Sequence, residues 1–245
     1  MTVTDKIANR IDLIAPGALF GYDTLGLTSD EVMAGAKALG RLAVRGTIKR
    51  ARKGYYYKPK VSLFGAQKPR EDVLLELYLF DKNKQTAYVT GVRLYNRLGL
   101  TTQVASSIRV ASLDKQIKGK VGNTLIKPAK SYVGVTSENI RYLELLDVMK
   151  DFNAIPDLSK EEGLMYLEKA IENLKCEEIK KLINYGSCYP PKVRALLGAL
   201  LETSADAANF ITELRELKKS INPTSRYQYG LSNTLLPTVG SWNIT

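Results

Sequence analysis

The sequence contains no histidine and only two cysteines, Cys176 and Cys188, among its 245 residues. Histidine is the usual general base and the commonest metal ligand, so Ser/His and Cys/His arrangements for nucleophilic catalysis are excluded. Two cysteines cannot define a disulfide framework, and a zinc site would need carboxylates to complete it. We therefore expect a protein that is not an enzyme, with reduced thiols and no catalytic, cofactor-binding or metal-binding residues.

Long apolar runs are also missing. No run approaches the roughly 18 to 20 residues that a membrane-spanning helix needs. The N-terminal stretch MTVTDKIANR lacks the apolar segment of a secretion signal. We expect a cytoplasmic protein with no membrane partner. A hydrophobic fraction of 44% with 25% charged residues is ordinary for a globular protein, which argues against a disordered chain or a coiled-coil rod.

Acidic residues are scarce at the N-terminal end. Residues 1–70 hold 13 Lys/Arg against 5 Asp/Glu, whereas residues 141–245 hold 13 against 14, within a net charge of +11. Between Val32 and Arg70 there are eleven basic residues and no acidic one. This asymmetry predicts an N-terminal module that binds a polyanion. The alternative is a basic face that is only solvated surface.

The spacing of apolar residues predicts two helices in this module. The first follows an N-cap at Thr4 and carries isoleucines at i, i+4 and i+7, from Ile7 to Ile14. A short apolar piece, ALF, and the turn-forming GYDTLG lead to a second helix, with Ser29 as its N-cap and Gly46 just past its end. The apolar face expected on this second helix comprises Val32, Ala36, Leu39 and Ala43.

Another face of the second helix is basic. Its residues lie four apart along roughly 12 Å of helix, at 1.5 Å rise per residue. Such a stripe suits DNA, because lysine neutralises phosphates and arginine can bind guanine edges with two hydrogen bonds. Decoration of a solvent-facing surface is the alternative. The residues of the stripe are Lys37, Arg41 and Arg45.

The stretch KRARKGYYYKPK, residues 49–60, predicts a β-hairpin with its turn at Lys53 and Gly54. Pro59 suits the end of an edge strand and not a central one. We expect Tyr56 to pack on the helices with Ala51, leaving the arginines and at least one other tyrosine outward. Packing of all three tyrosines in the core or sheet edge is the alternative. Without a bulge, the opposed pairs are Arg52–Tyr55, Ala51–Tyr56 and Arg50–Tyr57.

Helix, short strand, helix and hairpin is the order of a winged helix-turn-helix domain, which we predict over residues 1–68. The second helix would enter the major groove of double-stranded DNA, and the hairpin would act as a wing on phosphates or the minor groove. The residues expected to contact DNA are Lys37, Arg41, Arg45, Lys49, Arg50, Arg52, Lys53, Tyr55 and Lys58.

We predict a second domain, the antitoxin or effector domain, over residues 69–245. The expected fold class of the whole chain is α+β. An α+β middle over 69–137 has a helical stretch near 70–80 and β-branched, glycine-punctuated strands. Its KGKVGNT segment superficially resembles a phosphate loop, but it lacks the GK[ST] ending and reads as a turn between strands. Residues 138–222 show a helical period, and residues 223–245 predict a docked tail. The side chains expected to dock it are Tyr227, Leu235, Leu236 and Trp242.

Four stretches together resemble the AbiEi family of antitoxins and related transcriptional regulators from bacterial abortive-infection toxin–antitoxin modules. They are GTIKRARKGYYYKPK, TGVRLYNRLGLTTQV, YPPKVRALLGALLE and SINPTSRYQYGLSN…LP…WNI. The resemblance implies an N-terminal winged helix followed by an antitoxin domain. It also implies a role in phage defence: repression of the protein's own operon through its promoter DNA, and neutralisation of a nucleotidyltransferase-like toxin.

Two other functions stay open. The protein could act mainly as an antitoxin by direct contact with its toxin, with the basic domain serving that contact and not DNA. A nucleic-acid-modifying enzyme is the third possibility, since carboxylate–magnesium chemistry needs no histidine, although no carboxylate cluster stands out in the sequence.

Overall fold

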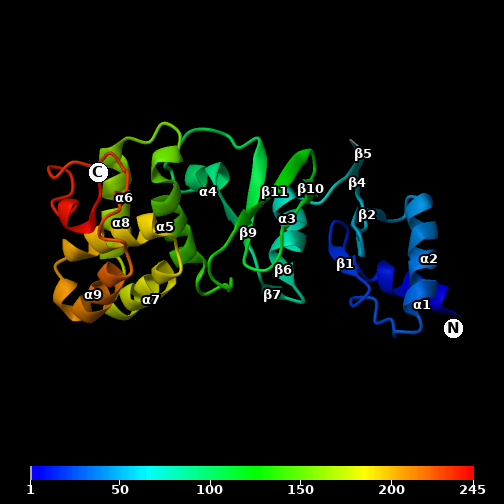
Figure 1. The fold of residues 1–245 in the computed structure, drawn as a ribbon. Coiled ribbons are helices and arrows are strands. Elements are labelled where there is room, and N and C mark those ends of the chain that lie inside the picture. Colours follow the sequence, from blue (N-terminus) through cyan, green and yellow to red (C-terminus); the bar gives the residue numbers. More distant parts are fainter. Residues whose placement is uncertain (1, 64) are drawn as a thin grey trace. The chain divides into compact units, whose positions relative to one another are not determined.

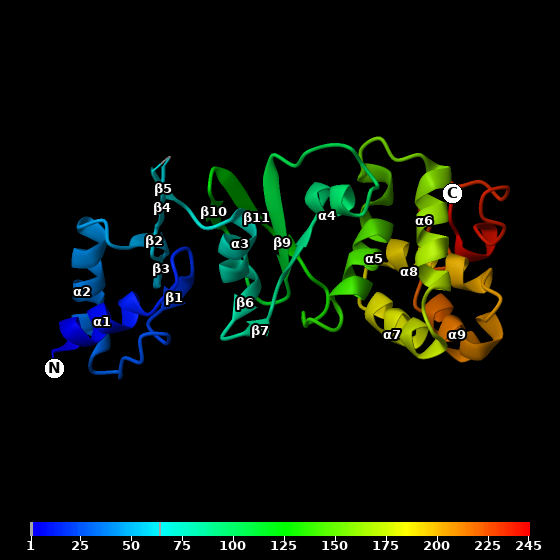
Figure 2. The same ribbon diagram turned by 180° about the vertical axis from the view of Figure 1, so that it is seen from behind.

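The computed structural model describes residues 2–63 and 65–245, and it has a mixed α+β architecture of helices and small sheets (Figure 1; Figure 2). The chain divides into two compact units, Met1–Leu77 and Tyr78–Thr245. Each unit has its own hydrophobic core. The predicted boundary after residue 68 precedes helix α3, and the division between the units falls within this helix. No helix of the described residues is long and apolar enough to cross a membrane.

The first unit has the predicted order of helix, strand, helix and hairpin. Strands β1, β3 and β2 form an antiparallel sheet in that order, and β4 and β5 form a further hairpin. The elements are α1 (Val3–Asp12), β1 (Leu19–Gly21), α2 (Val32–Val44), β2 (Lys49–Arg52), β3 (Tyr55–Tyr57), β4 (Lys60–Ser62), β5 (Gly65–Gln67) and α3 (Glu71–Leu79), the last of which ends in the second unit.

Helix α1 begins earlier than the sequence predicted. Its N-cap is Thr2 and not Thr4, because Asp5 completes a capping box with Thr2. The Thr2 hydroxyl accepts the Asp5 backbone N–H at 3.2 Å, and the Asp5 carboxylate accepts the Thr2 N–H at 3.0 Å. Ile7 is buried as expected, whereas Ile14 lies beyond the end of the helix and is half-buried.

Helix α2 also differs at its start and on its buried face. The N-cap is Glu31, and the predicted Ser29 cap is wrong. The buried positions are Gly35, Ala38 and Leu39, whereas Val32, Ala36 and Ala43 are half-buried. The core face is therefore rotated from the predicted one, because a Cβ on Gly35 would lie 2.5 Å from the Leu27 side chain. Gly35 thus lets the turn before α2 pack directly on the helix.

The hairpin of β2 and β3 contains a bulge that changes its predicted register. Arg52 pairs with Tyr55 as expected, but Ala51 is bulged, so that Arg50 lies opposite Tyr56 and Lys49 opposite Tyr57. The pairs Ala51–Tyr56 and Arg50–Tyr57 are therefore wrong. A bulge adds one unpaired residue to a strand and so moves every later pair by one position.

The three tyrosines of β3 divide between the core and the surface. Tyr56 and Tyr57 are buried, and Tyr55 is half-buried. Tyr56 stacks on Phe20 of β1 with ring centroids 6.1 Å apart, which confirms its predicted place against the core. Strand β3 is central in its sheet, so Pro59 follows a central strand and not the edge strand we expected. The proline is tolerated there because β3 ends at Tyr57.

The second unit combines a four-stranded sheet with a helical C-terminal part. The sheet order is β10-β11-β9-β8, with β9 and β11 parallel and the other pairs antiparallel. The elements are β6 (Phe80–Asp81), β7 (Lys84–Gln85), β8 (Tyr88–Thr90), α4 (Val92–Arg97), β9 (Ser107–Ser112), β10 (Gly119–Val121), β11 (Thr124–Lys130), α5 (Ile140–Asp151), α6 (Lys160–Glu172), α7 (Cys176–Ser187), α8 (Pro191–Glu202) and α9 (Ile211–Lys219).

Several expectations for this unit are confirmed. The KGKVGNT segment spans the turn between β10 and β11, and the residues after 138 are largely helical. The last predicted helix is divided, with a 3-10 segment, Ala207–Phe210, before α9. The tail docks through Trp242, whose ring fills the space where a Cβ of Gly198 on α8 would lie. Its indole N–H donates to Glu202 at 2.5 Å.

Candidate nucleic-acid interface

The basic stripe of α2 forms one continuous exposed surface. Lys37, Arg41 and Arg45 lie one turn apart and border a shallow hollow, with Gly40 and Val44 between them. All three cations are exposed, and Val44 is 90% exposed. The structure therefore brings together the three α2 residues that the sequence predicted, on an exposed face of the helix.

The charges of this stripe are largely uncompensated. Within the described residues, Lys37 and Arg45 form no ion pair, and Arg41 only donates to the Thr4 hydroxyl at 3.3 Å. The carboxylate of Glu31, at the start of the same helix, is held by the Lys6 ammonium at 2.8 Å. The Lys6 hydrogen bond, followed by one from the Thr28 N–H, lowers the pKa of Glu31 to about 2. The acid nearest to the stripe in sequence is thus paired with Lys6.

The β2–β3 hairpin presents a second group of cations. Lys49, Arg50 and the turn residue Lys53 are exposed, whereas Lys58, just past β3, is half-buried. The Arg50 side chain makes one contact within the hairpin, from Nε to the Arg52 carbonyl oxygen at 3.4 Å. Three of these four side chains are accessible to a polyanion.

Arg52 and Tyr55 are engaged within the unit. The Arg52 guanidinium lies 5.0 Å from the centroid of the Tyr55 ring, which places it in cation–π contact. The same guanidinium donates to the carbonyl oxygen of Leu77 near the end of α3. Both residues are half-buried. Arg52 therefore joins the hairpin to α3, and Tyr55 packs against its guanidinium.

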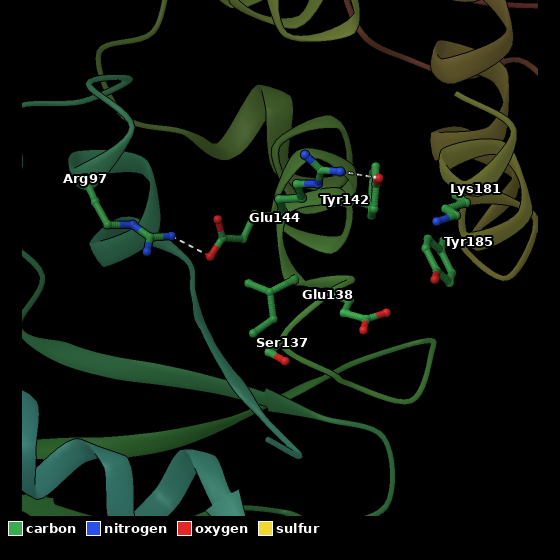
Figure 3. Close-up of a pocket in the computed structure, with 9 residues that line it drawn as sticks. Arg97, Ser137, Glu138, Tyr142, Glu144, Lys181 and Tyr185 are labelled. Carbon is green, nitrogen blue, oxygen red and sulfur yellow. Dashed lines mark hydrogen bonds and ion pairs between the residues drawn. The ribbon is translucent and has the colours of Figure 1, made fainter. Parts of the chain in front are cut away.

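The second unit contains a polar pocket of about 600 Å³ (Figure 3). Figure 3 shows the Arg97 side chain directed at Glu144, and their charged groups are 2.5 Å apart. Arg141 donates to the Tyr142 hydroxyl at 2.7 Å and also pairs with Glu178. Burial outweighs the Arg97 contact and raises the pKa of Glu144. Both arginines of the pocket are thus committed to protein partners.

A buried polar network, which the sequence did not predict, is centred on Asp147 of α5. Its side chain is fully buried and accepts from the Tyr88 hydroxyl at 2.9 Å and the Thr90 hydroxyl at 2.5 Å. Lys150 pairs with the other carboxylate oxygen at 2.6 Å. Burial is the main cause that raises the pKa of Tyr88, and the Asp147 charge adds to it. The network ties β8 to α5, and nothing in the local pattern LELLDVMKD indicates that its aspartate lies inside.

Across residues 2–63 and 65–245, no group of three or more Cys, Asp or Glu side chains is placed to hold a metal ion. Cys176 begins α7 and Cys188 is exposed at its end, and both are free.

Two comparisons found similar proteins. A segment of the chain is 30% identical over 118 residues to the ATP-dependent RNA helicase CHR1 of Candida albicans. The segment makes up 47% of the chain and 19% of the helicase, so the chain spans about a fifth of that relative's length. Among solved structures, the RV2827C protein from Mycobacterium tuberculosis superposes with a TM-score of 0.50 at 10% identity, covering 92% of this chain and 84% of that one.

The RV2827C likeness shows a shared fold alone. A family model gives the more direct assignment, because it matches residues 6–139, which is more than half of the chain and includes both the α2 stripe and the sheet of the second unit. The protein belongs to DUF6088, a family of unknown function.

Proposed function

We propose that the protein is a DNA-binding transcriptional regulator and that its first unit acts as a winged helix-turn-helix domain. The observation that carries this proposal is the exposed α2 stripe, whose three cations form no ion pair with any described residue. Two hydrogen-bonded turns, Leu25 N–H to Tyr22 O and Gly26 N–H to Asp23 O, occupy the place of a helix between β1 and α2. Helix α2 is then the recognition helix, and the β2–β3 hairpin is the wing.

In this proposal α2 lies in the major groove. Arg41 and Arg45 reach guanine edges, and Lys37 neutralises a phosphate. The exposed Val44 offers an apolar contact for a thymine methyl group, and Gly40 lets the DNA approach the helix backbone closely. The two arginine guanidinium groups and the Val44 side chain could therefore distinguish bases, in addition to neutralising phosphate charge.

The wing binds the DNA backbone. Lys49, Arg50 and Lys53 are exposed and supply phosphate contacts, which fix orientation without reading sequence. Arg52 has a positioning role, because it joins the wing to α3 through the Leu77 carbonyl. Its replacement would displace the wing and so affect binding indirectly.

The test is binding to the DNA upstream of the protein's own gene. Arg41→Ala with Arg45→Ala should weaken specific binding at least tenfold, because each good arginine–base contact contributes about 1 to 3 kcal/mol. The matched control is Arg10→Ala with Arg215→Ala, which removes the same charge from exposed positions outside the interface. Electrophoretic mobility shifts with specific and scrambled duplexes measure the difference. Equal losses in the two double variants would refute recognition by α2.

We propose, as a second function, that the protein is the antitoxin of a toxin–antitoxin module and counters a nucleotidyltransferase-like toxin. It rests on the resemblance of TGVRLYNRLGLTTQV and YPPKVRALLGALLE to AbiEi-type antitoxins. These stretches lie in the second unit, around α4 and in α8, and this unit has a core separate from that of the basic unit. The division of cores favours separate tasks for the two units.

Co-expression with the product of the neighbouring gene tests this second function. If the second unit neutralises the toxin, residues 78–245 alone should restore growth as well as the full chain does. If the basic unit makes the toxin contact, rescue should be lost with residues 1–77 and also in the full-length Arg41→Ala, Arg45→Ala variant. A neighbouring gene that is not toxic and has no nucleotidyltransferase features would contradict the antitoxin function.

A further inference from the structure

One end of the sheet in the second unit carries an exposed basic surface. Arg109 of β9, Lys120 of β10 and Lys127 of β11 are all exposed, and Leu125 between them is 54% exposed. Lys127 is in register with Arg109, and Lys120 with Leu125. In-register neighbours and residues two apart on a strand point to the same side of a sheet. These four side chains therefore share one face; we call its three cations, Arg109, Lys120 and Lys127, the sheet patch.

The rest of the sheet is covered. On the same face, Tyr88 and Thr90 of β8 bond to Asp147 of α5. On the opposite face, the ring of Tyr78 packs on Gly119, where a Cβ would come within 2.4 Å of it. The sheet patch is thus an open end of a face that α5 otherwise closes, and its exposure is not a general property of the sheet.

Two of the positive charges of the sheet patch lie next to each other, and no described carboxylate pairs with them. Arg109 and Lys127 are directly opposite on neighbouring strands, and like charges in such positions are destabilising. In the described part of the chain, none of the three cations forms an ion pair, and no Asp or Glu occurs from Lys115 to Ser137. A nearby lysine, Lys115, does pair with Asp81, at 2.7 Å. The sheet patch therefore lacks the compensation that its neighbour has.

The position of Arg109 is also shaped by its surroundings. Gly91, which precedes α4, has a φ of +72° and would place a Cβ 2.9 Å from the Arg109 Cδ. The aliphatic stem of Arg109 consequently lies against the Gly91 backbone, and any larger residue at position 91 would displace it. The side chain is held by its stem while the residue stays exposed. Such support reduces the conformational entropy that binding would cost.

We propose that the sheet patch is a second nucleic-acid-binding surface, which contacts the phosphate backbone. Three cations on adjacent strands, which form no ion pair with any described residue, complement a line of phosphates, and binding would relieve the Arg109–Lys127 repulsion. Contacts of this kind add affinity and salt dependence but carry no sequence information. The inference goes beyond the proposed function, which concerns α2 and the wing, and it does not require α2 to read bases.

The experiment compares two full-length triple variants that remove equal charge. One is Arg109→Ala, Lys120→Ala and Lys127→Ala; the control is Arg215→Ala, Lys169→Ala and Lys181→Ala, all exposed on the helices of the second unit. Fluorescence anisotropy with a labelled scrambled duplex, over roughly 50 to 200 mM salt, gives the slope of log K against log salt. The sheet-patch variant should flatten the slope by about two to three units, since each phosphate contact contributes about 0.9. The control should change it by well under one unit.

The outcomes separate this inference from the proposed function. Equal changes in both triple variants would overturn the inference, while Arg41→Ala, Arg45→Ala could still abolish specific binding. Loss confined to the sheet-patch variant, with specific binding intact in the α2 variant, would support the inference and refute recognition by α2. A wild-type chain that binds no duplex at any salt concentration would overturn both.

A single substitution separates binding from folding. Lys127→Glu places a carboxylate opposite Arg109, so the thermal midpoint should rise at low salt while affinity for the duplex falls further than in Lys127→Ala. A fall in both quantities would show that Lys127 supports the fold, and it would contradict the proposed binding role.

Discussion

Helices α2 and α5 both carry cations, but they use them differently. On α2 the exposed cations Lys37 and Arg45 form no ion pair with any described residue. Around α5, Arg141 pairs with Glu178, and Lys150 pairs with the buried Asp147. The same residue types are therefore exposed and unpaired among the described residues on one helix, and they join the protein's own elements on the other. Whether a charge has a protein partner is more informative about its role than how many charges a helix carries.

Removal of Asp147 should give the largest effect and would test the α5 side of this comparison. Asp147→Ala leaves the hydroxyls of Tyr88 and Thr90 and the Lys150 ammonium without their common acceptor. We expect a loss of about 3 to 5 kcal/mol in the free energy of unfolding, measured by urea denaturation, because one partner of a buried ion pair is removed.

The control for that variant is Glu177→Ala, which removes an acid that is 81% exposed and loosely paired with Lys180. Its cost should stay below about 1 kcal/mol. Similar losses in the two variants would mean that burial of the α5 carboxylate contributes little to stability.

Gly198→Ala should have the next largest effect and extends the comparison to apolar packing in the same unit. The added methyl group would meet the Trp242 ring at 2.1 to 2.5 Å, so the tail must move. Overpacking of this kind costs about 1 to 3 kcal/mol. Thermal unfolding and tryptophan fluorescence measure the change, since Trp242 is the only tryptophan. Gly240→Ala, with nothing within 4 Å of its Cβ, is the control and should leave the fluorescence unchanged.

Gly40→Ala should raise stability, unlike the two preceding variants, and it tests whether the exposed face of α2 binds DNA. Gly40 lies within α2, and a Cβ there would meet nothing within 4 Å. Alanine should raise the stability of the first unit by up to about 1 kcal/mol, because glycine is the poorer helix former. The methyl group would enter the hollow between Lys37 and Arg41, so specific DNA binding should weaken as stability rises. Stability and binding that rise together would argue against close approach of DNA at Gly40.

The smallest effect concerns Glu31, the N-cap residue of α2. The pKa of Glu31 is lowered from about 4.5 to about 2, chiefly by the Lys6 hydrogen bond and then by the Thr28 N–H. A lowered pKa means that the stabilisation is complete above about pH 4.5 and is lost as the pH falls through about 2. Glu31→Gln should therefore be slightly less stable than wild type near neutral pH and should match it below about pH 2. A difference between the two that does not depend on pH would contradict this role of the charge.

Local features of the fold could be predicted from the sequence, and contacts between distant segments could not. The α2 stripe follows from i, i+4 spacing, and the glycine that ends the helix, Gly46, has the expected left-handed φ of +79°. The parallel pairing of β9 with β11 joins strands separated by β10, and no local pattern specifies such a pairing. The like-charged Arg109 and Lys127 become neighbours only through that pairing.

Contacts between distant segments also decide which charged side chains of the first and second units are engaged by the protein itself. Arg52 follows the basic pattern of its neighbours, yet its guanidinium is bound by Leu77, 25 positions later in the chain. The local sequence around Asp147 does not show that this side chain is buried, because its partners Tyr88 and Thr90 come from β8, more than 50 residues earlier. Charge density along the sequence therefore located the candidate surface but did not show which of its cations are free to bind.

The bulge at Ala51 has a geometric consequence for the β2–β3 hairpin. In an unbulged strand Arg50 and Arg52, two residues apart, would project from the same side of the hairpin. With Ala51 bulged, they pair with the consecutive residues Tyr56 and Tyr55, so they leave the ribbon on opposite sides. Arg52 can then bind the Leu77 carbonyl oxygen while Arg50 stays exposed to solvent. The single bulged residue thus directs two arginines of the same short strand to opposite faces of the hairpin.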